Sequence, residues 1–325
     1  MAETSNIAKM ADKLSTELFN DFNWERVGEA NTNWECVDER HAEETHPSDV
    51  VFYYDNPYSL SRTYINCDLK SYAVSSITRN AIAIAATRLA RSLSCAEKSA
   101  DWQNKYLHQN VSPEICALLF VYNHDGDYDS DFQRLVSAVD YQRLEVPPGS
   151  KLFVLGPKDI FWLNNVRYDI VYMRGNGELP PKPRCAFHYP HLGRKKNVQP
   201  EKAKAATLDM LTGPWITMEY QPPTGPMRRG FLIYYRPRGE HIEEFLYLID
   251  HILHYQILTE DTEVHIKTID PDPNSHSRFR RAIDQYVHEH SAGAELKNML
   301  DRITFSEISN LRLKFSEQQI GMENA

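Results

Sequence analysis

The stretch HPSDVVFYYDNPYSLSRTYINCDLKSY, residues 46–72, decides the fold of the N-terminal half of the chain. Its first part, Val50–Tyr54, is rich in β-branched and aromatic residues and is followed by the turn residues Asp55-Asn56-Pro57, which predicts a strand that ends there. Its second part, Arg62–Lys70, alternates apolar and polar residues, which predicts another strand. If the two strands pair as a hairpin, Asp49, at the start of the first, can approach the second.

The predicted strand Arg62–Lys70 has one apolar and one polar face, because side chains alternate along a strand. Asp68 and Lys70 lie on the same face, roughly 6–7 Å apart along the strand. In a hairpin, Asp49 approaches Asp68. The apolar face carries Ile65, Cys67 and Leu69, and the polar face carries Tyr64, Asn66, Asp68 and Lys70.

Two carboxylates that meet at one end of a sheet repel each other unless a cation joins them. Mg²⁺ binds through one or two carboxylates and keeps several waters. A lysine beside such an ion can orient a water and offset the charge that builds on a phosphate. The alternative interpretation is a surface ion pair between Asp68 and Lys70, with Pro47-Ser48-Asp49 serving only as a turn.

The segments around this hairpin predict an α-β-β-β-α-β order. Apolar residues at helical spacing predict helices over Asn6–Phe22 and Ile77–Leu93. Asn33–Val37 is a possible first strand, and the continuous apolar run Ile115–Tyr122 is typical of a buried strand.

This combination resembles the PD-(D/E)XK nuclease superfamily. The matching residues are Pro47-Ser48-Asp49 and, nineteen residues after Asp49, Asp68-Leu69-Lys70, within a similar element order over roughly residues 5–125. The resemblance implies a restriction-endonuclease-like α/β core and cleavage of DNA phosphodiesters with one or two Mg²⁺ ions, for which Mn²⁺ can substitute.

The resemblance also implies roles for individual residues. Asp49 and Asp68 would be metal ligands, and Lys70 would position the attacking water or stabilise the transition state. The family often adds an acid from the first helix, where Glu17 is the best match, and Glu35 is the alternative. Asp68 stands where Glu is commoner in the family.

The second half of the chain is predicted to be an α+β accessory domain that binds DNA, a partner protein or a second copy. We place the boundary between residues 146 and 147, near Pro147-Pro148-Gly149, so the nuclease-like domain spans 1–146 and the accessory domain 147–325. Strands are expected at Leu152–Leu155, Ile216–Tyr220, Gly230–Tyr235 and Glu263–Ile269, with helices over Ala203–Leu211, His241–Ile257, His276–His288 and Ala294–Arg302.

The charge of the 325-residue chain is −9 overall, so any contact with nucleic acid must be local. The segment Leu179–Pro200 contains no acid and interleaves cations with aromatics, which suits a phosphate backbone or equally a solvated loop. The predicted helix over Ile77–Leu93 carries further arginines. If this helix flanks the predicted metal site, they would contact the phosphates of the DNA. The DNA-binding candidates are Arg184, Arg194, Lys195, Lys196 and Arg79.

The five cysteines are scattered, odd in number and never spaced as CxxC, so we expect reduced thiols, mostly in the core, and a cytoplasmic protein. Cys185, His188 and His191 are at zinc-ligand spacing, but no fourth ligand is evident. We expect no secretory signal and no membrane span, and the sequence contains no evident repeat.

These observations together predict a metal-dependent DNA endonuclease with a fused accessory domain. By family analogy it would be controlled by a regulatory or motor partner, as in restriction or antiphage defence, and it can form homo-oligomers. The alternative is a catalytically inactive nuclease-like module that binds DNA or protein, in which Asp68 and Lys70 form a salt bridge.

Overall fold

The computed structural model describes residues 2–190, 204–291 and 293–311. It divides into two compact units, one reaching Phe161 and the other spanning Trp162–Leu311. In the described residues, no helix combines the length and apolar character that a membrane crossing needs.

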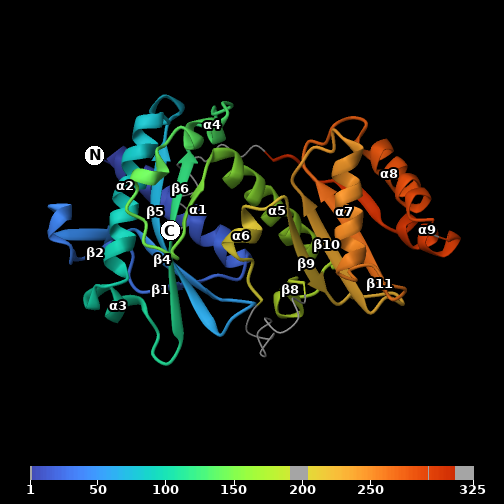
Figure 1. Ribbon diagram of the computed structural model, residues 1–325, viewed down its shortest axis with the longest axis horizontal. Helices are drawn as coiled ribbons and strands as arrows, with labels where there is room; N and C mark the ends of the chain where they lie inside the picture. Colours follow the sequence, from blue (N-terminus) through green and yellow to red (C-terminus); the bar gives the residue numbers. More distant parts are fainter. Residues whose placement is uncertain (1, 191–203, 292, 312–325) are drawn as a thin grey trace. The chain divides into compact units, whose positions relative to one another are not determined.

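The first unit contains a five-stranded sheet in the order β1-β4-β5-β6-β7, with β2 and β3 in a separate two-stranded ribbon (Figure 1). Its helices and strands are α1 (Ala2–Asp21), β1 (Glu25–Val27), β2 (Thr32–Glu35), β3 (Thr45–Ser48), β4 (Val50–Asp55), β5 (Ser61–Tyr72), α2 (Arg79–Ala96), α3 (Ala100–Tyr106), β6 (Ser112–Asn123), α4 (Phe132–Ser137) and β7 (Leu152–Leu155).

The predicted hairpin is confirmed. β4 and β5 pair antiparallel from Val50–Cys67 to Asp55–Arg62, and β5 continues into a parallel pairing with β6. The mixed sheet and its flanking helices confirm the expected restriction-endonuclease-like α/β core.

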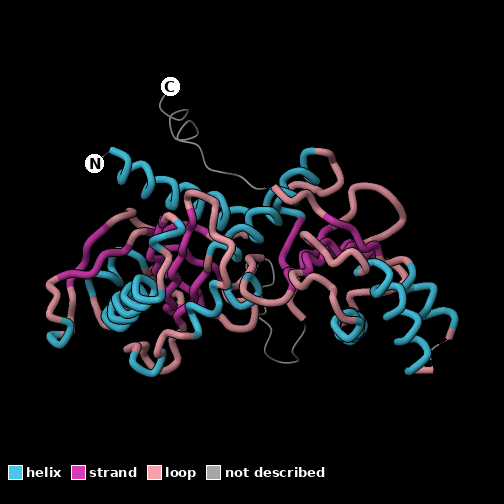
Figure 2. Tube along the Cα trace, turned by 90° about the horizontal axis from the view of Figure 1, so that it is seen from above, coloured by secondary structure: helices cyan, strands magenta, loops and turns pink. Residues whose placement is uncertain are grey.

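Helices cover both faces of this sheet (Figure 2). On one face, Phe19 of α1 packs its ring against Phe52 of β4 and Phe120 of β6, at centroid distances of 5.3 and 5.9 Å. On the other face, α2 buries residues such as Leu89 against Leu119 of β6. The apolar stripes of both helices therefore form the core, as their periodicity predicted.

Two strand predictions differ from the structure. The expected first core strand, Asn33–Val37, corresponds to β2, which pairs only with β3; the core strand at this edge is the three-residue β1, which is too short to give a periodic signal. Leu152–Leu155 was assigned to the second domain, but as β7 it pairs in parallel with β6 of the first sheet. The units divide after Phe161, later than the expected residue 146, because β7 completes the first sheet.

The second unit contains another five-stranded sheet, in the order β12-β11-β10-β9-β8. Its elements are α5 (Pro157–Gly175), whose first turn lies in the first unit, β8 (Cys185–Phe187), α6 (Leu208–Leu211), β9 (Trp215–Tyr220), β10 (Arg229–Tyr235), α7 (Ile242–His254), β11 (Thr262–Thr268), α8 (Ser275–Glu289), α9 (Ala294–Asp301) and β12 (Thr304–Glu307).

The two sheets repeat one pairing pattern. Along each sheet, in chain order, the first two pairings are antiparallel and the last two are parallel: β1-β4-β5-β6-β7 in the first and β8-β9-β10-β11-β12 in the second. Both sheets follow a long helix, and both have a helical connection before the first parallel strand. The structure thus contains a topological repeat that the sequence does not reveal.

Candidate active site

Asp49 lies at a bend between β3 and β4. The last registered pair of the β4–β5 hairpin is Val50 with Cys67, so one step further along the ladder Asp49 comes opposite Asp68. The Asp49 carbonyl accepts a hydrogen bond from the Asn31 N–H at 2.9 Å, which fixes the backbone at the bend. The register of the hairpin therefore brings together the two aspartates that the sequence motif singled out.

The Asp49 carboxylate is half-buried and sits in a negative environment. Burial, followed by the charge of Asp68, raises the pKa of Asp49 to about 6. The Leu69 N–H, which donates to Asp49 Oδ2 at 2.7 Å, and the Lys70 ammonium oppose this rise. Ionised Asp49 and Asp68 thus repel each other at a position fixed by a backbone hydrogen bond.

Lys70 completes the group on the same face of β5. Its ammonium pairs with Asp68 Oδ1. Burial alone would lower the pKa of Lys70, but the carboxylates of Asp68 and Asp49 outweigh it and raise the pKa above its ordinary value. Lys70 therefore remains protonated at neutral pH and acts as a cation and hydrogen-bond donor, and it is not available as a base.

A buried hydrogen-bond network joins the residue before Asp49 to β5 and α2. Ser48, directly before Asp49, donates to Asn66 Oδ1 at 2.7 Å. It also accepts the indole N–H groups of Trp34 and Trp102, at 2.9 and 3.3 Å. Asn66 in turn donates to Ser92 of α2 at 3.0 Å. Beyond this network the polar face of β5 is partly solvated from Asp68 onward, whereas Tyr64 and Asn66 are enclosed in the core.

Other polar groups lie near the site. Tyr72, partly buried on the same face of β5, has its pKa raised by burial, while the charges of Lys70, Asp68 and Arg88 of α2 also act on it. Ser71 lies 3.3 Å from His124, measured from Oγ to Nδ1. Arg88 is exposed on the side of α2 that approaches this end of β5, as expected if the helix flanks the site.

The two candidate third acids, Glu17 and Glu35, have other partners in the structure. Glu17 lies 3.9 Å from Lys13 on its own helix, measured from Oε1 to Nζ. Glu35 is exposed on β2, and its backbone N–H donates to Asp101. Within the described residues, neither joins Asp49 and Asp68 in a compact three-ligand group.

Comparison with known protein families identifies the N-terminal part of the chain. Residues 1–159 match the family model described as the GAPS4 protein PD-(D/E)XK nuclease domain. The N-terminal part of this chain is a PD-(D/E)XK nuclease domain. The resemblance seen in the sequence is thereby confirmed, and the match extends through β7, which the structure also places in the first sheet. No curated protein matches the chain.

The second unit lacks this acidic pair at the corresponding positions. In its β9–β10 pairing, Trp215 and Tyr235 occupy the places of Val50 and Cys67. One step further, Pro214 stands where the nuclease domain has Asp49, and Arg236 stands opposite in place of Asp68. Among the described residues, the end of the β9–β10 hairpin therefore carries no counterpart of the aspartate pair.

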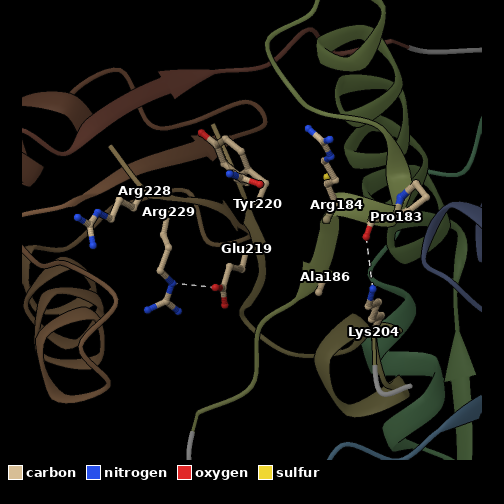
Figure 3. Close-up of a pocket in the computed structure, with 10 residues that line it drawn as sticks. Pro183, Arg184, Ala186, Lys204, Glu219, Tyr220, Arg228 and Arg229 are labelled. Carbon is tan, nitrogen blue, oxygen red and sulfur yellow. Dashed lines mark hydrogen bonds and ion pairs between the residues drawn. The ribbon is translucent and has the colours of Figure 1, made fainter. Parts of the chain in front are cut away.

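The second unit instead presents cations around an open pocket of about 270 Å³ (Figure 3). Arg184 and Arg228 are exposed at its rim. Arg229 pairs with Glu219 at 2.8 Å, and His188 lies 3.1 Å from the same carboxylate. Burial alone would raise the pKa of Glu219, but these two partners lower it to about 2.

The predicted DNA-binding residues fall in three places. Arg184 lines the pocket of the second unit, and Arg79 is exposed in the first turn of α2. Arg194, Lys195 and Lys196 lie outside the described residues. The predicted zinc ligand His191 also lies outside them; of its companions, Cys185 is buried and His188 contacts Glu219.

Proposed function

We propose that the N-terminal domain is a Mg²⁺-dependent DNA endonuclease with Asp49, Asp68 and Lys70 as its catalytic residues. The observation that carries the proposal is the convergence of the two carboxylates, one with its pKa raised to about 6 by burial and by the other, beside a protonated lysine. Perturbed pKa values gathered in one small group of side chains are typical of functional sites.

The residues present fit the metal that the family uses. The donors are carboxylate oxygens, which Mg²⁺ prefers, and Mn²⁺ accepts the same ligands. Asp49 and Asp68 would hold a divalent cation, which would offset the repulsion that, after burial, raises the Asp49 pKa. When bound, the ion would activate a water for in-line attack and polarise the scissile phosphate.

Two groups of the protein would orient the metal ligand and stabilise the transition state. The Leu69 N–H holds the Asp49 carboxylate in one orientation. Lys70, charged and partly buried, would donate a hydrogen bond to the attacking water or to a phosphate oxygen, where it offsets the negative charge of the transition state. Hydrolysis would leave a 5′-phosphate, as the family resemblance implies.

The second candidate function, an inactive nuclease-like binding module, is favoured by the ion pair between Lys70 and Asp68. An ordinary strand-surface pair would look the same. It does not account for Asp49, which is held half-buried beside a second carboxylate and, among the described residues, has no direct ion pair. We therefore prefer the catalytic function.

The two candidates are separated by plasmid cleavage in Mg²⁺ or Mn²⁺. The variants are Asp68→Asn and Lys70→Gln, with Glu178→Gln as the matched control because it removes an exposed charge in the second unit. The nuclease account expects the wild type and the control to cut and both site variants to lose at least about 100-fold in rate. An inert wild type that still binds DNA, with binding unaffected by either site variant, supports the inactive module.

The second unit would hold DNA through Arg184 and Arg228, whose exposed guanidinium groups suit phosphate oxygens. We further propose that a regulatory or motor partner controls cleavage, as in restriction or antiphage defence. Incubating the purified nuclease with phage or plasmid DNA, alone and with cell extract, tests this: the proposal expects a stimulated rate with extract, and full activity of the isolated chain on any DNA opposes it.

A further inference from the structure

Four side chains that the active site does not use converge in the first unit. Cys36 follows β2, His41 lies in a 3₁₀ turn, His46 lies in β3 and Cys95 lies in the last turn of α2. One ligand atom from each, Sγ or a ring nitrogen, lies within 4.8 Å of all the others. Among the described residues, this is the one group of three or more such ligands that gathers in this way.

Five of the six separations of these atoms lie within about 0.5 Å of the edges of a tetrahedral zinc site. With Zn–S of about 2.3 Å and Zn–N of about 2.0–2.1 Å, a tetrahedron has edges of about 3.8 Å for S–S, about 3.6 Å for S–N and about 3.4 Å for N–N. Between Cys36 and Cys95 the S–S distance is 3.7 Å, and between His41 Nδ1 and His46 Nε2 the N–N distance is 3.4 Å. Three S–N distances are 3.6, 3.1 and 3.3 Å.

The outer nitrogen of each histidine faces a carboxylate. His46 Nδ1 lies 3.3 Å from Glu43 Oε2, and His41 Nε2 lies 3.5 Å from Glu145 Oε2. Zinc-bound histidines commonly direct their second nitrogen to a carboxylate, which fixes the ring and strengthens the ligand. The acidic loop between Cys36 and His46 therefore has a specific role, because it supplies one of these outer carboxylates.

We propose that Cys36, His41, His46 and Cys95 bind one structural zinc ion. All four positions are filled by protein, which is the arrangement of structural zinc, whereas catalytic zinc keeps one position open. Two thiolates and two neutral imidazoles also neutralise the charge of the ion. The S–S distance of 3.7 Å excludes a disulfide, whose bond is about 2.05 Å long.

This ion would fasten the β2–β3 ribbon to the end of α2. Three of the four ligands lie on the ribbon, and His46 stands three residues before Asp49 on the same strand-and-bend segment. His41, His46 and Cys95 are at most 3% exposed and Cys36 is partly exposed, so most of the site is enclosed in the domain. Zinc would therefore order the segment that carries Asp49 without touching the nucleic acid.

The test is the metal content of the full chain, measured by mass spectrometry after purification without chelators. We expect one zinc per chain in the wild type and in Asp68→Asn, and its loss in Cys36→Ser and Cys95→Ser. Cys116→Ala is the matched control, because it removes another buried thiol of the same unit and should keep the zinc.

Two further measurements keep the test valid if a cysteine variant fails to fold. Cobalt(II) substituted into the wild type should give the visible absorption of a tetrahedral S₂N₂ site, and all five cysteines should titrate as thiols after denaturation. Absence of zinc and of the cobalt spectrum, or only three titratable thiols, overturns the proposal. None of these readouts depends on nuclease activity, so failure of the zinc site is distinguishable from failure of the proposed function.

Discussion

Substituting Asp49 by asparagine should stabilise the folded protein when Mg²⁺ is absent. The amide retains an oxygen to accept the Leu69 N–H but removes the charge that burial and Asp68 disfavour. A carboxyl whose pKa rises from 3.8 to about 6 destabilises the folded state, when ionised, by at most about 3 kcal/mol. Because the side chain is partly exposed, we expect Asp49→Asn to raise the free energy of unfolding by about 1–2 kcal/mol.

The effect should depend on pH with a definite sign. Below the unfolded pKa of 3.8, Asp49 is protonated in both states and contributes no difference. Between 3.8 and about 6 only the folded state keeps the proton, so the wild type loses stability relative to Asp49→Asn as pH rises. Above about 6 the full difference is present.

Urea unfolding in Mg²⁺-free buffer, at acidic and at neutral pH, measures this difference. Adding Mg²⁺ should reverse the order at neutral pH, because only the wild type gains the free energy of binding the ion. The control Glu178→Gln should show neither effect. An Asp49→Asn variant that is equal to or less stable than the wild type at neutral pH without Mg²⁺ would refute the reasoning.

Three further perturbations follow from the structure. Ser48→Ala should lower the free energy of unfolding by about 1–3 kcal/mol, since it leaves buried indole N–H groups without an acceptor; a urea midpoint like that of the wild type would contradict this. Mg²⁺ affinity, measured by calorimetry, should fall up to about tenfold for each pH unit below 6, as the proton competes for Asp49, and a flat profile would oppose that. The double variant Arg184→Glu, Arg228→Glu should weaken DNA binding and reduce the dependence of DNA affinity on salt concentration. If that dependence is unchanged, the pocket does not contact DNA.

The sequence predicted the hairpin and the residues that it brings together, because both depend on local patterns. Alternation along β5 sets which side chains share a face, and the pairing of β4 with β5 places Asp49 opposite Asp68. The alternation of side chains along β5 did not predict how deeply each side chain is buried. Tyr64 and Asn66 share the polar face with Asp68, yet they are enclosed, because the ribbon, α2 and α3 pack on that part of the sheet.

The features that sequence reasoning missed depend on contacts between distant segments. β7 joins the first sheet through a pairing with β6 across more than twenty residues. The cysteine–histidine cluster unites Cys36 with Cys95, fifty-nine positions away. The spacing of Cys36, His41 and His46, each five residues from the next, was the local signal that could have indicated a metal site; the fourth ligand required the fold.

The central claim is that Asp49 and Asp68 together hold a divalent ion. Crystals soaked in Mn²⁺ and measured for anomalous scattering test it most directly. The account predicts an anomalous peak for manganese within coordination distance of both carboxylates, with Lys70 nearby. The peak should be absent in Asp68→Asn. Saturating Mn²⁺ that leaves the space between the two aspartates without a peak, or that binds only elsewhere in the chain, would contradict it.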